Sequence, residues 1–179
     1  MTLAGTTGLR LYLGATMGLS LWLRSTFPAS AIADAITDDQ LFVKLARNIL
    51  VGRWLGPYSE YTHVKGVFYS LFIDLSFLSG VPLKIFEQAA YLGAALLFCE
   101  VVARLHRRRW AAALLFAFLA LNPILFHPEL ARVVREGVYI PLALGVVALA
   151  GGGFLIKHRT RAAQIFWLAA LGLAGVRSG

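Results

Sequence analysis

Charged residues are scarce in this sequence, and it contains one cysteine. Asp, Glu, Lys and Arg make up 15% of the 179 residues, whereas 59% are hydrophobic, and the mean hydropathy is +0.71. Soluble globular domains contain considerably more charge, so this shortage argues against one. Cys99 has no second cysteine to pair with, which excludes an internal disulfide and a cysteine-based metal site. We therefore predict an integral membrane protein.

Acidic residues are scarcer than basic ones. The 9 acidic and 17 basic residues give a formal net charge of +8, which in a soluble protein would suggest nucleic acid as a partner. In a membrane protein, short basic clusters between apolar runs instead retain loops on the cytoplasmic side. We take this second explanation and expect membrane lipid, and no nucleic acid, as a partner.

The long apolar runs predict an all-α, polytopic bundle of transmembrane helices, because about 20 apolar residues span a bilayer as a helix. Five runs have approximately this length, and we predict spans at residues 11–33, 83–105, 110–126, 138–156 and 162–176. The first run contains Arg24, whose long side chain could reach the interface. Outer loops at residues 34–82 and 127–137 complete a single membrane domain.

The shorter run at residues 66–80 decides the topology. If it crossed the membrane, the basic clusters at residues 104–109 and 157–161 would lie on the side opposite Arg10. If it does not cross, all three lie together, as positive-inside reasoning requires. The run is then an amphipathic juxtamembrane helix in the outer interface. We predict a cytoplasmic N-terminus, a periplasmic or extracellular outer face, and the inner membrane of a bacterium as the location.

Another amphipathic juxtamembrane helix is predicted at residues 38–51. Thr37-Asp38-Asp39-Gln40 has the spacing of a capping box, and Gly52 suits the C-terminal stop. One face is apolar and the opposite face polar. The apolar residues are Leu41, Phe42, Leu45, Ala46 and Ile49, and the polar ones are Lys44, Arg47 and Asn48. The spacing leaves three roles open for Asp38 and Asp39: stabilising the helix dipole, holding a divalent cation and acting as a general base.

Basic residues near the outer face are candidate phosphate ligands. Lys65 precedes the juxtamembrane helix on which Tyr69 lies, and it either anchors the chain at the interface or attracts a lipid phosphate. In the second outer loop, Arg132, Arg135 and Glu136 have spacings that permit salt bridges if the loop is helical. Alternatively, the arginines bind phosphate and Glu136 faces the carboxylates of the first loop.

The order of these features resembles the first outer loop of the GT-C superfamily of membrane glycosyltransferases. The resemblance rests on Asp38–Phe42, on Gly52–Pro57, on Lys65-Gly66 and on Tyr69, in that order after a first span. It is greatest to the aminoarabinose transferase and protein O-mannosyltransferase branch, in which an acidic pair begins one juxtamembrane helix and a lysine precedes a second. Asn122-Pro123 and the residues after it look like the second outer loop of that branch.

The resemblance implies a sugar transferase that uses a polyprenyl-phosphate donor at the outer face. Asp38 or Asp39 would take the family's catalytic aspartate position, as general base or as the group that orients the acceptor. The implied residues are catalytic Asp38, Asp39 and Glu136 and substrate-binding Lys65, Tyr69, Arg132 and Arg135. Cations near the donor would stabilise the charge that develops on its phosphate. The sequence specifies no cofactor, although a divalent cation suits adjacent carboxylates.

Members of this superfamily are much longer, so the resemblance implies a truncated module that lacks a C-terminal part or a partner subunit. A hypothesis from another class is a non-catalytic membrane subunit or scaffold that binds lipid or a partner protein through the same loop. It predicts that Asp38 and Asp39 can be replaced without loss of function if the helix cap survives. A small transporter ranks lowest, because it would need ionisable residues at mid-membrane.

Overall fold

The computed structural model is all-helical, which confirms the predicted fold class. It describes residues 3–27, 29, 38–54, 67–127, 132–133, 135–155 and 165. The elements are α1 (Leu3–Ser25), α2 (Asp38–Leu50), α3 (Val67–Ser79), α4 (Leu83–His106), α5 (Arg109–Ala120), the 3-10 helix η1 (Pro123–Phe126) and α6 (Glu136–Leu155).

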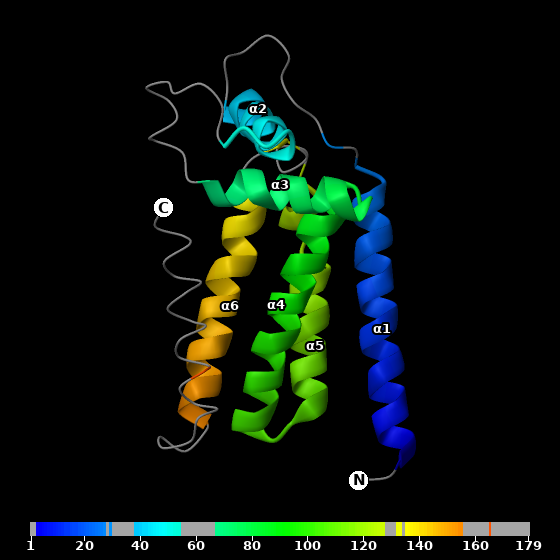
Figure 1. The fold of residues 1–179 in the computed structure, drawn as a ribbon. Helices are drawn as coiled ribbons and strands as arrows, with labels where there is room; N and C mark the ends of the chain where they lie inside the picture. The colour runs from blue at the N-terminus through cyan, green and yellow to red at the C-terminus, as the bar shows by residue number, and fades with distance from the viewer. Residues whose placement is uncertain are drawn as a thin grey trace.

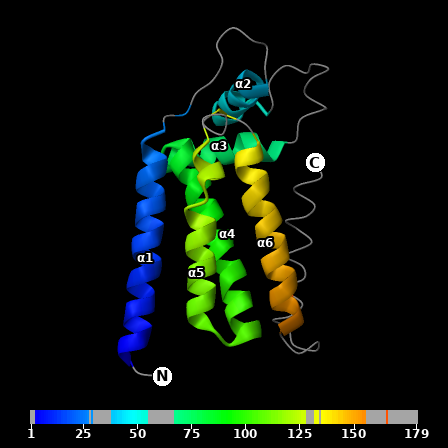
Figure 2. The same cartoon turned by 180° about the vertical axis from the view of Figure 1, so that it is seen from behind.

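Helices α1, α4, α5 and α6 run side by side, and α2 and α3 lie across one end of them (Figure 1). The view from behind shows the same arrangement, with α2 beyond α3 and the N-terminus at the opposite end (Figure 2). We call α2 and α3 the cap, and the end of the bundle beneath them the cap end. The opposite end, where α4 turns into α5 through Arg107 and Arg108, is the arginine end.

Three helical stretches are long and apolar enough to cross a membrane: Leu83–His106, Arg109–Phe126 and Glu136–Gly153. They correspond to three of the five predicted spans. The fifth, at residues 162–176, lies outside the described residues except for Ile165. The first predicted span, at residues 11–33, is also not among the three. Helix α1 is long enough to cross a membrane, but it is not apolar enough.

The position of α1 corrects the first predicted span. The helix covers Leu3–Ser25 rather than residues 11–33, so it begins and ends about two turns earlier. Its end has a local cause, because the Ser25 and Thr26 hydroxyls donate to the Trp22 and Leu23 carbonyls at 2.6 and 2.7 Å. A proline also follows Phe27, and a proline disfavours the helical conformation of the residue before it.

The first cap helix has the amphipathic pattern expected from the sequence. Phe42, Leu45 and Ala46 are at most 3% exposed, whereas Lys44 and Arg47 lie on the exposed face. Phe42 contacts the ring of Tyr69 edge-on, with 5.0 Å between ring centroids. The apolar face of α2 therefore packs on α3.

Both cap helices end at a glycine. Gly52 follows α2 with a φ of +74°, and Gly80 follows α3 with a φ of +69°. After α2, the Gly52 and Arg53 amides donate to the Ile49 and Asn48 carbonyls, both at 2.9 Å. This is a Schellman motif, which only a residue tolerant of positive φ completes without strain. The predicted stop at Gly52 is confirmed, and α3 ends in the same way.

The polarity of α3, within the run predicted as an amphipathic juxtamembrane helix at residues 66–80, is the reverse of that of a water-facing amphipathic helix. Its buried residues are Tyr69, Ser70, Asp74 and Ser76, all of them polar. Its exposed residues include Leu71, Leu75, Phe77 and Leu78, at 36% to 72%. The reason is that α2 and α4 supply polar partners inside: the Ser70 hydroxyl donates to the Phe42 carbonyl at 3.4 Å.

Two apolar clusters hold the bundle together. One lies between α4 and α5, around Leu92 and Phe116, and partly buried residues of α1 pack against it. The other joins the cap to the start of α6, because Phe42 and Tyr69 pack with Val133 and Val138. The second cluster therefore fixes the cap over the bundle and brings the chain before α6 against it.

Candidate functional site

Six polar side chains are buried together at the cap end, directly beneath α3. We call them the polar cluster; they are Ser20, Arg24, Tyr69, Lys84, Glu87 and Gln88, each at most 4% exposed. They come from α1, α3 and α4. Burial of so many polar groups is expensive unless each finds a partner, so their contacts decide what the cluster does.

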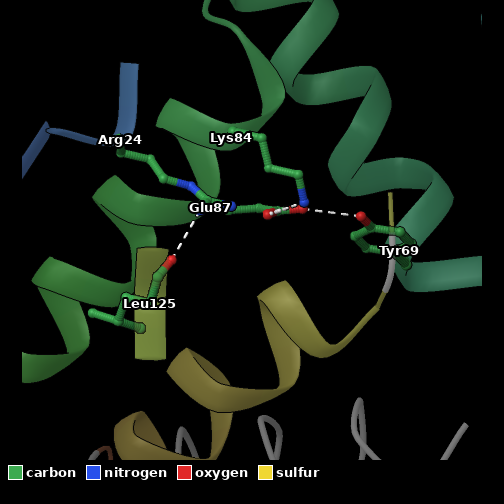
Figure 3. A network of polar contacts seen from close by, with 5 residues as sticks. All are labelled: Arg24, Tyr69, Lys84, Glu87 and Leu125. Atoms are coloured by element: carbon green, nitrogen blue, oxygen red, sulfur yellow. Dashed lines mark hydrogen bonds and ion pairs between the residues drawn. The ribbon is translucent and has the colours of Figure 1, made fainter. Parts of the chain in front are cut away.

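Glu87 is the centre of the cluster. Its Oε1 accepts a hydrogen bond from the Tyr69 hydroxyl at 2.9 Å, and its Oε2 accepts one from Lys84 Nζ at 2.7 Å. Both donors converge on the carboxylate at the end of the Glu87 side chain (Figure 3). Both carboxylate oxygens are thus satisfied, as a buried ion pair requires if it is not to destabilise the fold.

The carboxylate of Glu87 also fits closely against the start of α6. A Cβ atom added to Gly137 would lie 2.5 Å from Glu87 Oε2 and 2.6 Å from its Cδ. Only glycine leaves room for the carboxylate at this point of α6. Glu87, which belongs to α4, therefore contacts both α3 and α6.

Arg24 brings a second cation to the cluster from the last turn of α1. Its side chain points toward Glu87 (Figure 3), whose negative charge attracts it. One guanidinium nitrogen donates to the Leu125 carbonyl in η1 at 2.8 Å. The side chain is 3% exposed, which corrects the expectation that it reaches out to the interface. Arg24 instead ties α1 to the chain after α5.

A short chain of hydrogen bonds continues from the cluster toward α5. Gln88 Nε2 donates to Ser20 Oγ at 2.8 Å, and the Ser20 hydroxyl donates to the Ala120 carbonyl at 2.7 Å. The free volume beside the cluster is about 30 Å³, lined in part by Arg24, Glu87 and Gly137. This is the volume of about one water molecule. The polar cluster is therefore tightly packed between the helices, and the space beside it is too small for a sugar or a lipid.

Asp74 is a second buried acid at the cap end. It lies on α3, is 4% exposed, and neither of its carboxylate oxygens has a hydrogen-bond partner in the described part of the chain. Removal from water disfavours the charged form, so burial raises the pKa of Asp74 above its ordinary value of 3.8.

The predicted catalytic carboxylates belong to the starts of two helices at the cap end. Asp38 and Asp39 are the first two residues of α2, and their side chains lie outside the described residues. Glu136 is the first residue of α6 and is exposed. Phe42 of α2 and Val138 of α6 belong to the same apolar cluster, together with Tyr69 of α3.

The predicted phosphate ligands are distributed differently. Lys65 lies outside the described residues, and Arg132 is half-buried. Arg135 is half-buried with its guanidinium carbon 5.6 Å from the centroid of the Tyr139 ring, a cation–π distance. Tyr69 lies in the polar cluster, where its hydroxyl donates to Glu87.

Sequence reasoning missed Lys84 and Glu87 as a central pair. One signal was available, since they are three residues apart at the start of a long apolar run, where charged residues are expensive and are usually paired. Among the described residues, no three His, Cys, Asp or Glu side chains gather to hold a metal ion. Comparison of the chain with protein-family models, curated proteins and solved structures finds no match.

Proposed function

We propose that this chain is a GT-C-like membrane glycosyltransferase module, which transfers a sugar from a polyprenyl-phosphate donor at the outer face of the membrane. The observation that carries the proposal is the cap. Its two helices follow α1 and precede α4 in the sequence, and they lie across the bundle end (Figure 1). The resemblance implies two such juxtamembrane helices after the first span, the first of which begins with the catalytic acid.

The packing of the cap supports the same proposal. Val133 and Val138 contact Phe42 and Tyr69, so the chain before α6 lies against the cap. That chain contains the two arginines proposed to bind phosphate, and it leads directly into Glu136. Carboxylates at the start of α2 and arginines beside the start of α6 thus belong to one end of the molecule. The buried polar cluster has a positioning role, because it holds the cap on the bundle.

In the proposed reaction, a hydroxyl oxygen of the acceptor attacks the anomeric carbon of the donor sugar. The bond from that carbon to the phosphate oxygen breaks, and its electron pair leaves with the polyprenyl phosphate. Asp38 or Asp39 takes the proton of the acceptor hydroxyl as general base. Arg132 or Arg135 stabilises the charge that develops on the phosphate, since donors fixed at the site of developing charge lower the barrier.

The test is sugar transfer by the purified chain in lipid, with a set of polyprenyl-phosphate sugars as donors. We expect one of Asp38→Asn and Asp39→Asn to lower turnover at least about 100-fold, the lower end of typical general-base effects. Glu100→Gln is the matched control, because it removes an exposed carboxylate at the arginine end and should leave turnover unchanged.

Two results would contradict the proposal. One is turnover that survives in both aspartate variants. The other is no turnover by the unaltered chain with any donor while polyprenyl phosphate still binds; this would favour a non-catalytic lipid-binding subunit. Circular dichroism of each variant separates loss of activity from loss of the fold.

A further inference from the structure

Two adjoining cavities lie at the arginine end, far from the cap. The larger has a volume of about 420 Å³ and is lined by Glu100, Ala103, Arg104, Arg107 and Arg109. Its volume falls within the range of small-molecule sites, which is about 300 to 1,000 Å³. All of these residues belong to the last turns of α4, the turn after it, or the first residue of α5.

The second cavity extends the first into an apolar crevice between three helices. It measures about 230 Å³ and shares Glu100, Ala103 and Arg109 with the larger one. The rest of its lining is apolar and comes from α1, α4 and α5: Leu9, Leu13, Leu96, Cys99, Ala112 and Ala113. The two cavities together therefore present a cationic mouth that leads into an apolar interior.

The charges at the mouth are unequal. Arg104 Nε pairs with Glu100 Oε1 at 2.8 Å. In the described part of the chain, Glu100 provides the only carboxylate that lines either cavity. Arg107 and Arg109 have no ion-pair partner among the described residues. Arginine suits phosphate because its planar guanidinium can donate two parallel hydrogen bonds. The mouth has a positive excess, and an anion would balance it.

We propose that this double cavity binds an anionic phospholipid from the membrane leaflet on the side of the arginine end. The phosphate lies between Arg107 and Arg109, and part of an acyl chain enters the crevice between α1, α4 and α5. A soluble anion would leave the apolar crevice unused, and an uncharged lipid would leave the arginines without a counter-ion. Basic pockets between membrane helices are known sites for anionic headgroups.

Arg108 provides the control that separates a built site from general attraction between a basic loop and an anionic membrane. It lies in the same turn as Arg107 and Arg109 and carries the same charge. It does not line either cavity. A diffuse electrostatic effect depends on the number of arginines in the turn, whereas a site depends on which arginine is removed.

The experiment measures how much phosphatidylglycerol and phosphatidylcholine the full chain retains after extraction from mixed vesicles, by native mass spectrometry. We expect preferential retention of phosphatidylglycerol. Arg107→Gln and Arg109→Gln should each lower it about fivefold, as the loss of one arginine near an anionic headgroup implies, whereas Arg108→Gln should leave it unchanged. Equal losses in all three variants, or equal retention of both lipids, would overturn the proposal.

A second measurement tests the apolar half of the site. Ala103→Phe places a large side chain where the two cavities meet and keeps every arginine. It should lower phosphatidylglycerol retention as much as an arginine variant does. Soluble glycerol phosphate at millimolar concentration should not compete with the lipid. Competition by glycerol phosphate would show that the site binds a free anion instead, and full retention in Ala103→Phe would show that no acyl chain enters the crevice; either result overturns the proposal.

Discussion

The two ends of the bundle contain ion pairs of nearly equal length in opposite surroundings. Lys84 and Glu87 meet at 2.7 Å with side chains 3% and 4% exposed, whereas Arg104 and Glu100 meet at 2.8 Å with side chains 67% and 59% exposed. An exposed pair contributes little, because water screens it. A buried pair is costly to form and costlier to break. Burial, and not distance, therefore decides which of the two pairs matters more for stability.

The largest expected effect comes from removing the buried carboxylate. Glu87→Ala leaves the buried Lys84 ammonium without the carboxylate that it contacts and deprives the Tyr69 hydroxyl of its acceptor. We expect the free energy of unfolding in micelles to fall by about 3 kcal/mol or more, as for other broken buried pairs. Chemical denaturation followed by circular dichroism measures the change.

Two further variants sharpen this comparison. Glu100→Ala breaks the exposed pair and should change stability by less than about 1 kcal/mol. Replacing both buried partners, Lys84→Met with Glu87→Leu, should be less harmful than Glu87→Ala alone, because the buried Lys84 ammonium is removed together with its carboxylate. Equal effects of Glu87→Ala and Glu100→Ala would refute the contrast between the two ends.

A smaller loss is expected from Gly137→Ala. The new Cβ would overlap the Glu87 carboxylate, which cannot swing away freely because Lys84 and Tyr69 hold it. Overpacking of this kind lowers the free energy of unfolding by about 1 to 3 kcal/mol. The control is Gly93→Ala, in the middle of α4, where an added Cβ meets nothing within 4 Å. Equal stability of the two variants would contradict the close approach of α6 to Glu87.

The smallest effect is a pH dependence at Asp74. Because burial raises its pKa above 3.8, the folded protein holds this proton more tightly than the unfolded chain. Stability is therefore lost as pH rises from 3.8 through the raised value. Asp74→Asn removes the charge, so it should melt at a higher temperature than the unaltered protein at pH 7, and the difference should shrink as pH falls toward 3.8. A difference that grows on acidification would mean that a cation pairs with Asp74.

The sequence predicts α2 well because its signals are local. The apolar face around Phe42 and Leu45 and the stop at Gly52 lie within one short segment, and α2 has both features. The all-helical class and three of the spans follow from composition alone. An amphipathic face and a glycine stop depend on neighbours along the chain, which a sequence displays directly.

The polar cluster could not be read from the sequence in the same way. Arg24 finds its acceptor 101 residues away, and Gln88 finds Ser20 at a separation of 68. Neither pairing leaves a periodic or adjacent pattern. Likewise, only the packing of α3 on α4 shows that the Tyr69 hydroxyl donates to Glu87. Tertiary partners decide which polar residues are available.

The reversed polarity of α3 limits how the cap can move. If α3 rolled about its own axis, Ser70 and Asp74 would turn outward while Leu71 and Leu75 turned in against the polar cluster. Both changes are unfavourable, so only one orientation of α3 about its own axis is stable. A ligand that needs space beneath the cap must therefore displace α3 without rotating it about its axis.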